Sequence, residues 1–243
     1  MVVLDYAKTR APLRIWACGD WHVSALTHDA PLFAKHFQRA VKERWPVIHV
    51  GDALEMVTPS SRVAQRGALR EQTADPEEQR KALITYLKQL AGGVILPGNH
   101  EFRVDMASGL DFIASITDAV GKTFTPLSEP GFIEVRVGKQ RYRFYVHHGE
   151  GPVVAVTTLF DRLQRDTEGL DAILCGHIHA GTFDPATILT PDGPRSIKRF
   201  RTGHYLRPPK YALIRPVSRI GACGSWLLTL DPVEHHIGQE WLD

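Results

Sequence analysis

Five short patches of this 243-residue chain combine glycine with side chains that bind metal ions. In chain order they read Gly19-Asp20-Trp21-His22, Gly51-Asp52, Gly98-Asn99-His100-Glu101, His147-His148-Gly149 and Gly176-His177-Ile178-His179. Carboxylate, amide-oxygen and imidazole donors without a thiolate suit a pair of hard or borderline divalent ions rather than a structural zinc site. Each patch alone is a weak signal, so the prediction of a metal centre rests on the whole ordered set.

Each patch closely follows a short apolar run, at residues 13–17, 47–50, 94–96, 142–146 and 172–174. An apolar run of this length that ends near a glycine indicates a buried strand followed by a turn. In open α/β sheets, ligands bind outside the carboxyl ends of the strands. We therefore expect the fold to bring all of these patches to one rim.

The first half of the chain alternates predicted strands and helices. A helix is expected over residues 31–45, because Phe33, Phe37 and Val41 recur on one face and Pro46 stops the helix. A second helix is expected to begin at Asp75, where an Asp-Pro-Glu-Glu sequence matches a capping box, and to end before residues 92–93. A third is expected over residues 105–120.

The second half has the alternating pattern of half-buried antiparallel strands. Residues 132–137 and 141–144 predict a hairpin around residues 138–140. A helix over residues 153–164 should follow, and further strands are expected at 186–190, 196–202 and 225–230. The chain has neither a repeat nor an obvious linker, and both halves supply candidate ligands. Residues 1–243 are therefore predicted to form a single domain.

Composition and charge favour an ordinary globular protein, with 43% apolar residues and a formal net charge of +2. No apolar stretch approaches a membrane-spanning length, and the first ten residues lack the apolar core of a signal peptide. We expect no membrane partner and a cytoplasmic location. Cys18, Cys175 and Cys223 form no C-x-x-C pair and are interpreted as small side chains in a reduced compartment.

The ordered series D-x-H, G-D, G-N-H-[DE], H and G-H-x-H resembles the calcineurin-like metallophosphoesterase superfamily. The resemblance extends from Asp20 to His179. The later sequence Thr202-Gly203-His204-Tyr205-Leu206-Arg207 is similar to a segment of a small-protein branch common in bacteria and their viruses. The resemblance implies an α/β fold, a four-layer α/β sandwich in which two mixed β-sheets are flanked by helices.

The resemblance also implies two divalent metal ions, with Mn²⁺ expected and Fe, Zn²⁺, Ni²⁺ or Co²⁺ as alternatives. Asp52 would bridge the two ions, and a hydroxide bridging them would attack phosphorus. His147 is favoured over His148 in the fourth patch, because the ligand in relatives directly ends the apolar strand. The complete implied ligand set is Asp20, His22, Asp52, Asn99, His147, His177 and His179.

Two residues are implied to act in catalysis without holding a metal. His100 would donate a proton to the leaving oxygen or stabilise its developing charge. Glu101 would orient His100 through a ring nitrogen. His148 and His204 are candidates for contact with the substrate; the alternative for each is an ordinary structural histidine.

A phosphodiesterase that acts on nucleic acid or nucleotides is the expected function. The alternatives are a phosphomonoesterase, including a protein phosphatase, and a non-catalytic scaffold of the same fold, which the intact ligand set and His100 disfavour. A phosphate-ester substrate is the expected partner, a nucleic-acid partner is allowed, and the oligomeric state is left open. Two basic groups could each be a solvated face or a phosphate-facing surface: Arg62, Arg66 and Arg70, and Arg195, Lys198, Arg199, Arg201 and Arg207.

Overall fold

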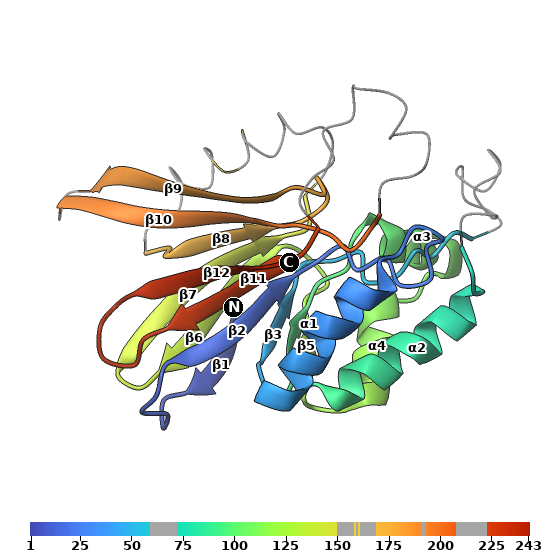
Figure 1. The fold of residues 1–243 in the computed structure, drawn as a ribbon, viewed down its shortest axis with the longest axis horizontal. Helices are drawn as coiled ribbons and strands as arrows, with labels where there is room; N and C mark the ends of the chain where they lie inside the picture. Colours follow the sequence, from blue (N-terminus) through green and yellow to red (C-terminus); the bar gives the residue numbers. More distant parts are fainter. Residues whose placement is uncertain (59–71, 150–157, 159, 161–168, 191–192, 208–222) are drawn as a thin grey trace.

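Two mixed β-sheets of six strands each make up the β-structure of the described residues in the computed structural model (Figure 1). The structure describes residues 1–58, 72–149, 158, 160, 169–190, 193–207 and 223–243. One sheet has the strand order β1-β6-β7-β8-β10-β9, and the other has the order β12-β11-β2-β3-β4-β5. These sheets confirm the predicted fold class.

The strands of the first sheet are β1 (Val2–Tyr6), β6 (Gly131–Val137), β7 (Gln140–His147), β8 (Ala172–Cys175), β9 (Gly181–Thr190) and β10 (Gly193–Thr202). Those of the second are β2 (Leu13–Cys18), β3 (Val47–His49), β4 (Gly93–Ile95), β5 (Phe124–Pro126), β11 (Ser225–Leu230) and β12 (Ile237–Leu242). The predicted hairpin is β6 paired with β7. The sequence patterns missed β1, β5 and β12.

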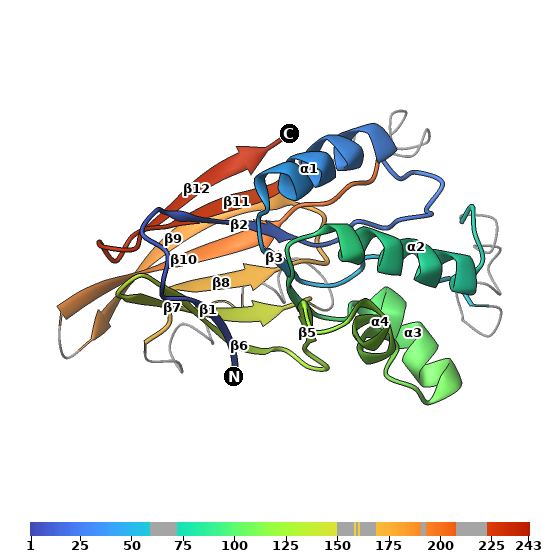
Figure 2. The same ribbon diagram turned by 90° about the horizontal axis from the view of Figure 1, so that it is seen from below.

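The helices gather beside the second sheet, as Figure 2 shows. They are α1 (Ala30–Glu43), α2 (Pro76–Gln89), α3 (Asn99–Ser108) and α4 (Phe112–Val120). The prediction of one helix over residues 105–120 was wrong, because Gly109 ends α3 in a left-handed conformation and Asp111 caps α4. The helix expected over residues 153–164 lies outside the described residues, apart from two isolated positions.

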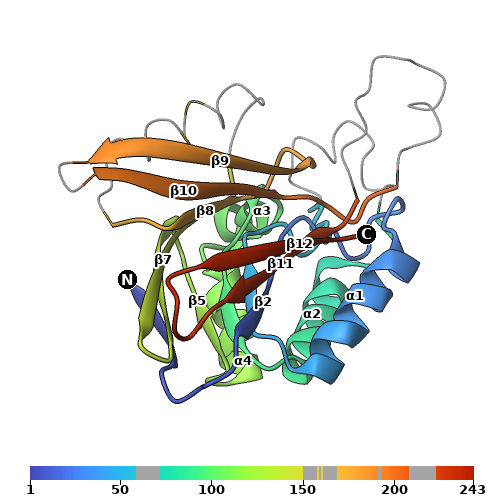
Figure 3. The ribbon, with the colours of Figure 1, turned by 60° about the vertical axis from the view of Figure 1, so that its left-hand side comes forward.

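The alternation of side chains along β2 places this strand between two hydrophobic cores. Ile15 and Ala17 point into a core between the two sheets, whereas Trp16 and Cys18 point into a core shared with the helices. Figure 3 shows β9 and β10 along the edge opposite to α1 and α2. None of the described helices is long and apolar enough to cross a membrane.

The strand directions decide where the polar patches lie. Strands β2, β3 and β4 run parallel in one sheet, and β7, β8 and β10 run parallel in the other. The loops after β2, β3 and β8 meet, since the backbone N–H of His177 donates to Asp20 Oδ2 at 3.0 Å and that of Asp20 donates to the Gly51 carbonyl at 2.8 Å. The carboxyl ends of both sheets therefore meet at one rim, as predicted.

Candidate metal centre

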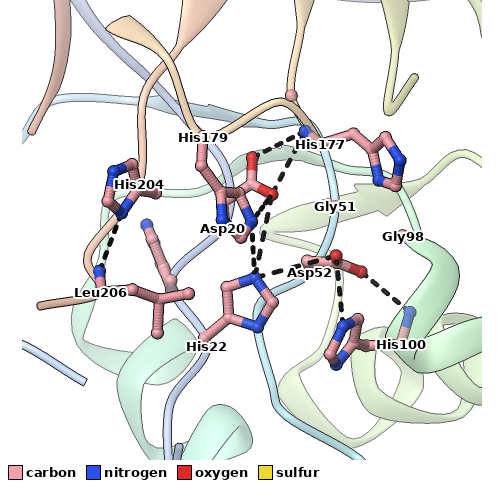
Figure 4. A network of polar contacts seen from close by, with 12 residues as sticks. Asp20, His22, Gly51, Asp52, Gly98, His100, His177, His179, His204 and Leu206 are labelled. Carbon is pink, nitrogen blue, oxygen red and sulfur yellow. Dashed lines mark hydrogen bonds and ion pairs between the residues drawn. The ribbon is translucent and has the colours of Figure 1, made fainter. Parts of the chain in front are cut away.

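Three side chains on the loops after β2 and β8 form the first half of the cluster (Figure 4). His179 Nε2 lies 3.2 Å from Asp20 Oδ1 and 3.1 Å from His22 Nε2. Asp20 and His22 are buried, and His179 is partly exposed. The carboxylate and two imidazoles thus direct three donor atoms at one point.

The second half of the cluster joins the loop after β3, the start of α3 and two loops of the other sheet. His148 Nε2 lies 3.2 Å from Asp52 Oδ2 and 3.1 Å from Asn99 Oδ1. His177 Nδ1 lies 2.9 Å from the same Asn99 oxygen. Asp52 Oδ2 is also 3.8 Å from His22 Nε2, so Asp52 stands between the two halves.

The donor set fits a pair of divalent cations. In each half a carboxylate lies beside two imidazoles, a mixture of oxygen and nitrogen ligands that suits Mn²⁺, Fe or Zn²⁺. The facing Nε2 atoms of His22 and His179 can share one proton or bind one cation. Asp52 turns one oxygen, Oδ2, toward both halves, and its Oδ1 accepts a hydrogen bond from the backbone N–H of His100. The residues therefore fit the two-ion site that the sequence implied, whereas the ions themselves stay a prediction.

Electrostatic coupling within the cluster favours ionised carboxylates. Burial alone would raise the pKa of Asp52, but His148, His100 and His22 outweigh it, so this pKa lies well below its usual range. Burial lowers the pKa of His148, but Asp52 and Asp20 outweigh this effect and raise it to about 9. A cation that binds between Asp52 and His148 would therefore compete with the proton of His148.

The backbone is strained at the cluster. Asp20, His22, Asp52, His177 and His179 all have φ between 47° and 71°, a region that residues other than glycine rarely adopt. Such conformations cost free energy and persist only where the surrounding structure enforces them. This concentration of strain at the predicted ligands is typical of a functional site.

The structure corrects the choice between the two histidines of the fourth patch. His147 Nδ1 accepts a hydrogen bond from the Gly149 N–H at 2.6 Å, and its ring stacks on Tyr145. His148 is the buried residue whose ring reaches Asp52. The structure therefore places His148, in place of the favoured His147, beside Asp52, because side chains alternate along β7 and the last residue of the strand and its successor face opposite ways.

The predicted contact between Glu101 and His100 is also corrected. Glu101 is fully buried and accepts the backbone N–H groups of Asp52, Leu54 and Gly98 at 2.8–3.0 Å. Neighbouring residues of a helix point in different directions, so Glu101 faces the loop after β3 instead of His100. Burial and Asp52 raise the pKa of Glu101 to about 7, against the effect of its N–H donors.

Sequence reasoning missed Glu55, which contacts two of the predicted residues. Glu55 Oε2 lies 3.0 Å from His22 Nδ1 and 3.8 Å from His100 Nδ1. The Glu55 carbonyl accepts a hydrogen bond from His100 Nδ1 at 2.5 Å. The sequence signal that could have pointed to Glu55 was its position three residues after the predicted ligand Asp52.

The remaining candidates lie beside the cluster or away from it. The ring of His204 stacks on His179 with centroids 5.1 Å apart, so His204 borders the site. In the second basic group, Arg195, Arg199 and Arg207 pair with carboxylates of Asp171, Asp184 and Asp29. The other group, at positions 62, 66 and 70, lies outside the described residues.

Comparison with known proteins agrees with this geometry. A family model described as calcineurin-like phosphoesterase matches residues 13–181. A search of curated proteins found no match.

Solved structures match this chain at low sequence identity. A predicted phosphoesterase from Streptococcus pneumoniae is 15% identical, with 97% of this chain and 92% of that chain covered and a TM-score of 0.43. Vps29 from Entamoeba histolytica, solved with zinc, is 13% identical, with coverage of 95% and 100% and a TM-score of 0.42. A candidate 5′-nucleotidase from Staphylococcus aureus is 12% identical at a TM-score of 0.54, and 96% of this chain matches 54% of that one. The family match over residues 13–181 includes the ligand-bearing loops of both sheets. The chain belongs to the calcineurin-like phosphoesterase family.

Proposed function

We propose that this protein is a two-metal phosphoesterase that hydrolyses phosphodiesters of nucleic acid or nucleotides. The observation that carries the proposal is the position of Asp52, which lies between two groups of ligand atoms contributed by both sheets. Two divalent ions bound there would supply Lewis-acid activation of a water and neutralise charge on the phosphoryl group. We propose Mn²⁺ as the first ion to test.

His100 is placed to handle the proton of the leaving group. Its Nδ1 is held by the Glu55 carbonyl, and its Nε2 lies 3.8 Å from Asp52 Oδ2. The ring therefore turns Nε2 toward the reacting centre, where that atom can pass a proton to the leaving oxygen. Burial is the largest cause that lowers the pKa of His100, to about 4, so the ring is neutral near pH 7 and must take up a proton, favoured by the negative charge of a bound phosphate ester, before it can act as the acid.

The choice of a diester rests on the segment Thr202 to Arg207, which is similar to a bacterial and viral branch of the family. The ion pairs of Arg195 and Arg199 add no support for a nucleic-acid track, since their charges face carboxylates. A monoester preference is therefore an outcome that the experiment must be able to return.

The experiment compares bis-p-nitrophenyl phosphate with p-nitrophenyl phosphate on metal-stripped protein reloaded with Mn²⁺. Faster diester turnover, lowered about 10²–10⁴-fold by His100→Asn, is expected from loss of a general acid. His235→Asn is the matched control, because His235 pairs with Asp171 away from the cluster. Faster monoester turnover would replace the diester proposal, and no turnover by metal-loaded protein would favour a scaffold.

A further inference from the structure

Arg103 brings a guanidinium group to the predicted proton donor. It lies on α3 three residues after His100, hence on the same side of the helix one turn later. Its Nη1 is 3.2 Å from His100 Nδ1, and its Nη2 is 3.2 Å from His100 Nε2. The Nη1 atom also lies 3.5 Å from the Glu55 carbonyl oxygen. The half-buried side chain thus ends at the edge of the cluster.

The partners of this guanidinium satisfy it poorly. A neutral imidazole ring can accept at most one hydrogen bond, through its single nitrogen lone pair, whereas a guanidinium group has five N–H donors. Among the described contacts, Arg103 has no ion pair with a carboxylate, although Glu55 and Asp52 lie around the same histidine. Eight of the other described arginines do have such pairs, whereas Arg10, Arg44 and Arg141 have none among the described contacts either: the eight are Arg14, Arg39, Arg80, Arg136, Arg143, Arg195, Arg199 and Arg207.

The charge around the cluster also gives Arg103 a particular place. In the part of the chain that the structure describes, it is the one lysine or arginine whose side chain contacts a predicted ligand or His100. The other charged groups there are the carboxylates, among them Asp20, Asp52 and Glu55, and the protonated imidazole of His148. A planar fork of N–H donors is well matched to phosphate oxygens, which it can bind in a bidentate manner.

We propose that Arg103 binds non-bridging phosphoryl oxygens of the substrate next to His100. The assignment rests on the proposed phosphoesterase function and adds to it a substrate-binding residue outside the family's motifs. On substrate binding, the guanidinium exchanges its contacts with the imidazole for two charge-assisted hydrogen bonds to the phosphoryl group. His100 Nε2 is then released from Arg103 and free to face the leaving oxygen.

A different role would be structural: Arg103 would only hold His100 against the Glu55 carbonyl. That role predicts a loss of turnover with unchanged affinity for phosphate, because the histidine and not the anion depends on the guanidinium. Binding of inorganic phosphate to metal-loaded protein separates the two roles without any need for catalysis.

The test measures calorimetric binding of inorganic phosphate and Mn²⁺ content for wild type, Arg103→Gln, Arg103→Lys and Arg80→Gln. Arg80 is the matched control, because it pairs with Glu77 on the surface of α2. We expect Arg103→Gln to weaken phosphate binding about 10- to 100-fold, the range of a charge-assisted hydrogen bond, at unchanged Mn²⁺ content. Arg103→Lys should lower the affinity for phosphate about 3- to 10-fold, since lysine keeps the charge without the planar fork of donors.

Several results would overturn the assignment. Phosphate affinity of Arg103→Gln within about twofold of wild type would do so, as would loss of Mn²⁺ from that variant or the absence of phosphate binding by wild type. If Arg103→Gln fails to fold, an unchanged affinity in Arg103→Lys has the same meaning. Wild type that binds phosphate through Arg103 but hydrolyses no ester would instead refute the proposed function and leave the anion site standing.

Discussion

Replacement of Glu101 should damage the stability of the fold more than the chemistry. Its carboxylate accepts the N–H groups of Asp52, Leu54 and Gly98, and all three contacts are buried. A buried donor left without an acceptor costs about 1–3 kcal/mol. Water that enters the space left by Glu101→Ala can satisfy part of this loss. We therefore expect Glu101→Ala to lower the free energy of unfolding by about 3 kcal/mol or more.

Glu101→Gln should be milder, because one oxygen remains. An amide oxygen in place of Oε2 still accepts from Asp52 and Gly98, whereas the amide nitrogen then faces the Leu54 N–H. One lost bond corresponds to about 1–3 kcal/mol. The expected order of stability is wild type, then Glu101→Gln, then Glu101→Ala.

The assay is urea unfolding in EDTA, so that bound metal contributes nothing. Glu77→Ala on α2 is the control, because its exposed ion pair should contribute about 0.5 kcal/mol or less. A free energy of unfolding for Glu101→Ala within about 1 kcal/mol of wild type, together with a sharp fall in kcat, would contradict this expectation. That pattern would restore the role of orienting His100 that the sequence suggested.

Three further changes test individual contacts. His148→Ala should lower Mn²⁺ content measured by elemental analysis, whereas His147→Ala should not, since only the former faces Asp52; equal losses would contradict the placement. Gly98→Ala should also reduce Mn²⁺ content, because a Cβ there would lie 2.0 Å from Asp52 Oδ1. Unchanged Mn²⁺ content would contradict this by showing that the backbone around Gly98 can shift without moving Asp52. Burial lowers the pKa of His49 to about 3, so the unfolded chain takes up the proton first and stability falls with pH below about 6.5. Between pH 8 and pH 5 this linkage amounts to about 2 kcal/mol, and urea unfolding of metal-free His49→Gln should show correspondingly less acid sensitivity; an identical pH dependence would contradict it.

The location of the site was predictable because strand ends are visible in the sequence. Apolar runs before Asp20, Asp52 and His177 marked buried strands, and parallel strands place their carboxyl ends on one edge. The capping box at Asp75 likewise marked the start of α2, which the structure confirms. These features depend on local chemistry that a short segment carries by itself.

Other features depend on contacts between distant segments, which local patterns do not contain. The strands β1 and β12 lie at sheet edges and were missed, since their burial is decided by pairing with β6 and β11. The direction of the His148 side chain depends on where the side-chain alternation of β7 ends. The contact of Glu55 with His22 and His100 depends on how the loop after β3 packs against α3.

Asp52 is the residue that we expect to join two metal ions in one site. The most direct measurement is the Mn²⁺ content of reloaded wild type and Asp52→Asn, by elemental analysis after removal of free metal, with electron paramagnetic resonance to detect coupling between ions. We expect two coupled ions per chain in wild type and a loss of both the coupling and at least one ion in Asp52→Asn. A single uncoupled ion in wild type, or an Asp52→Asn variant that keeps a coupled pair, would contradict it.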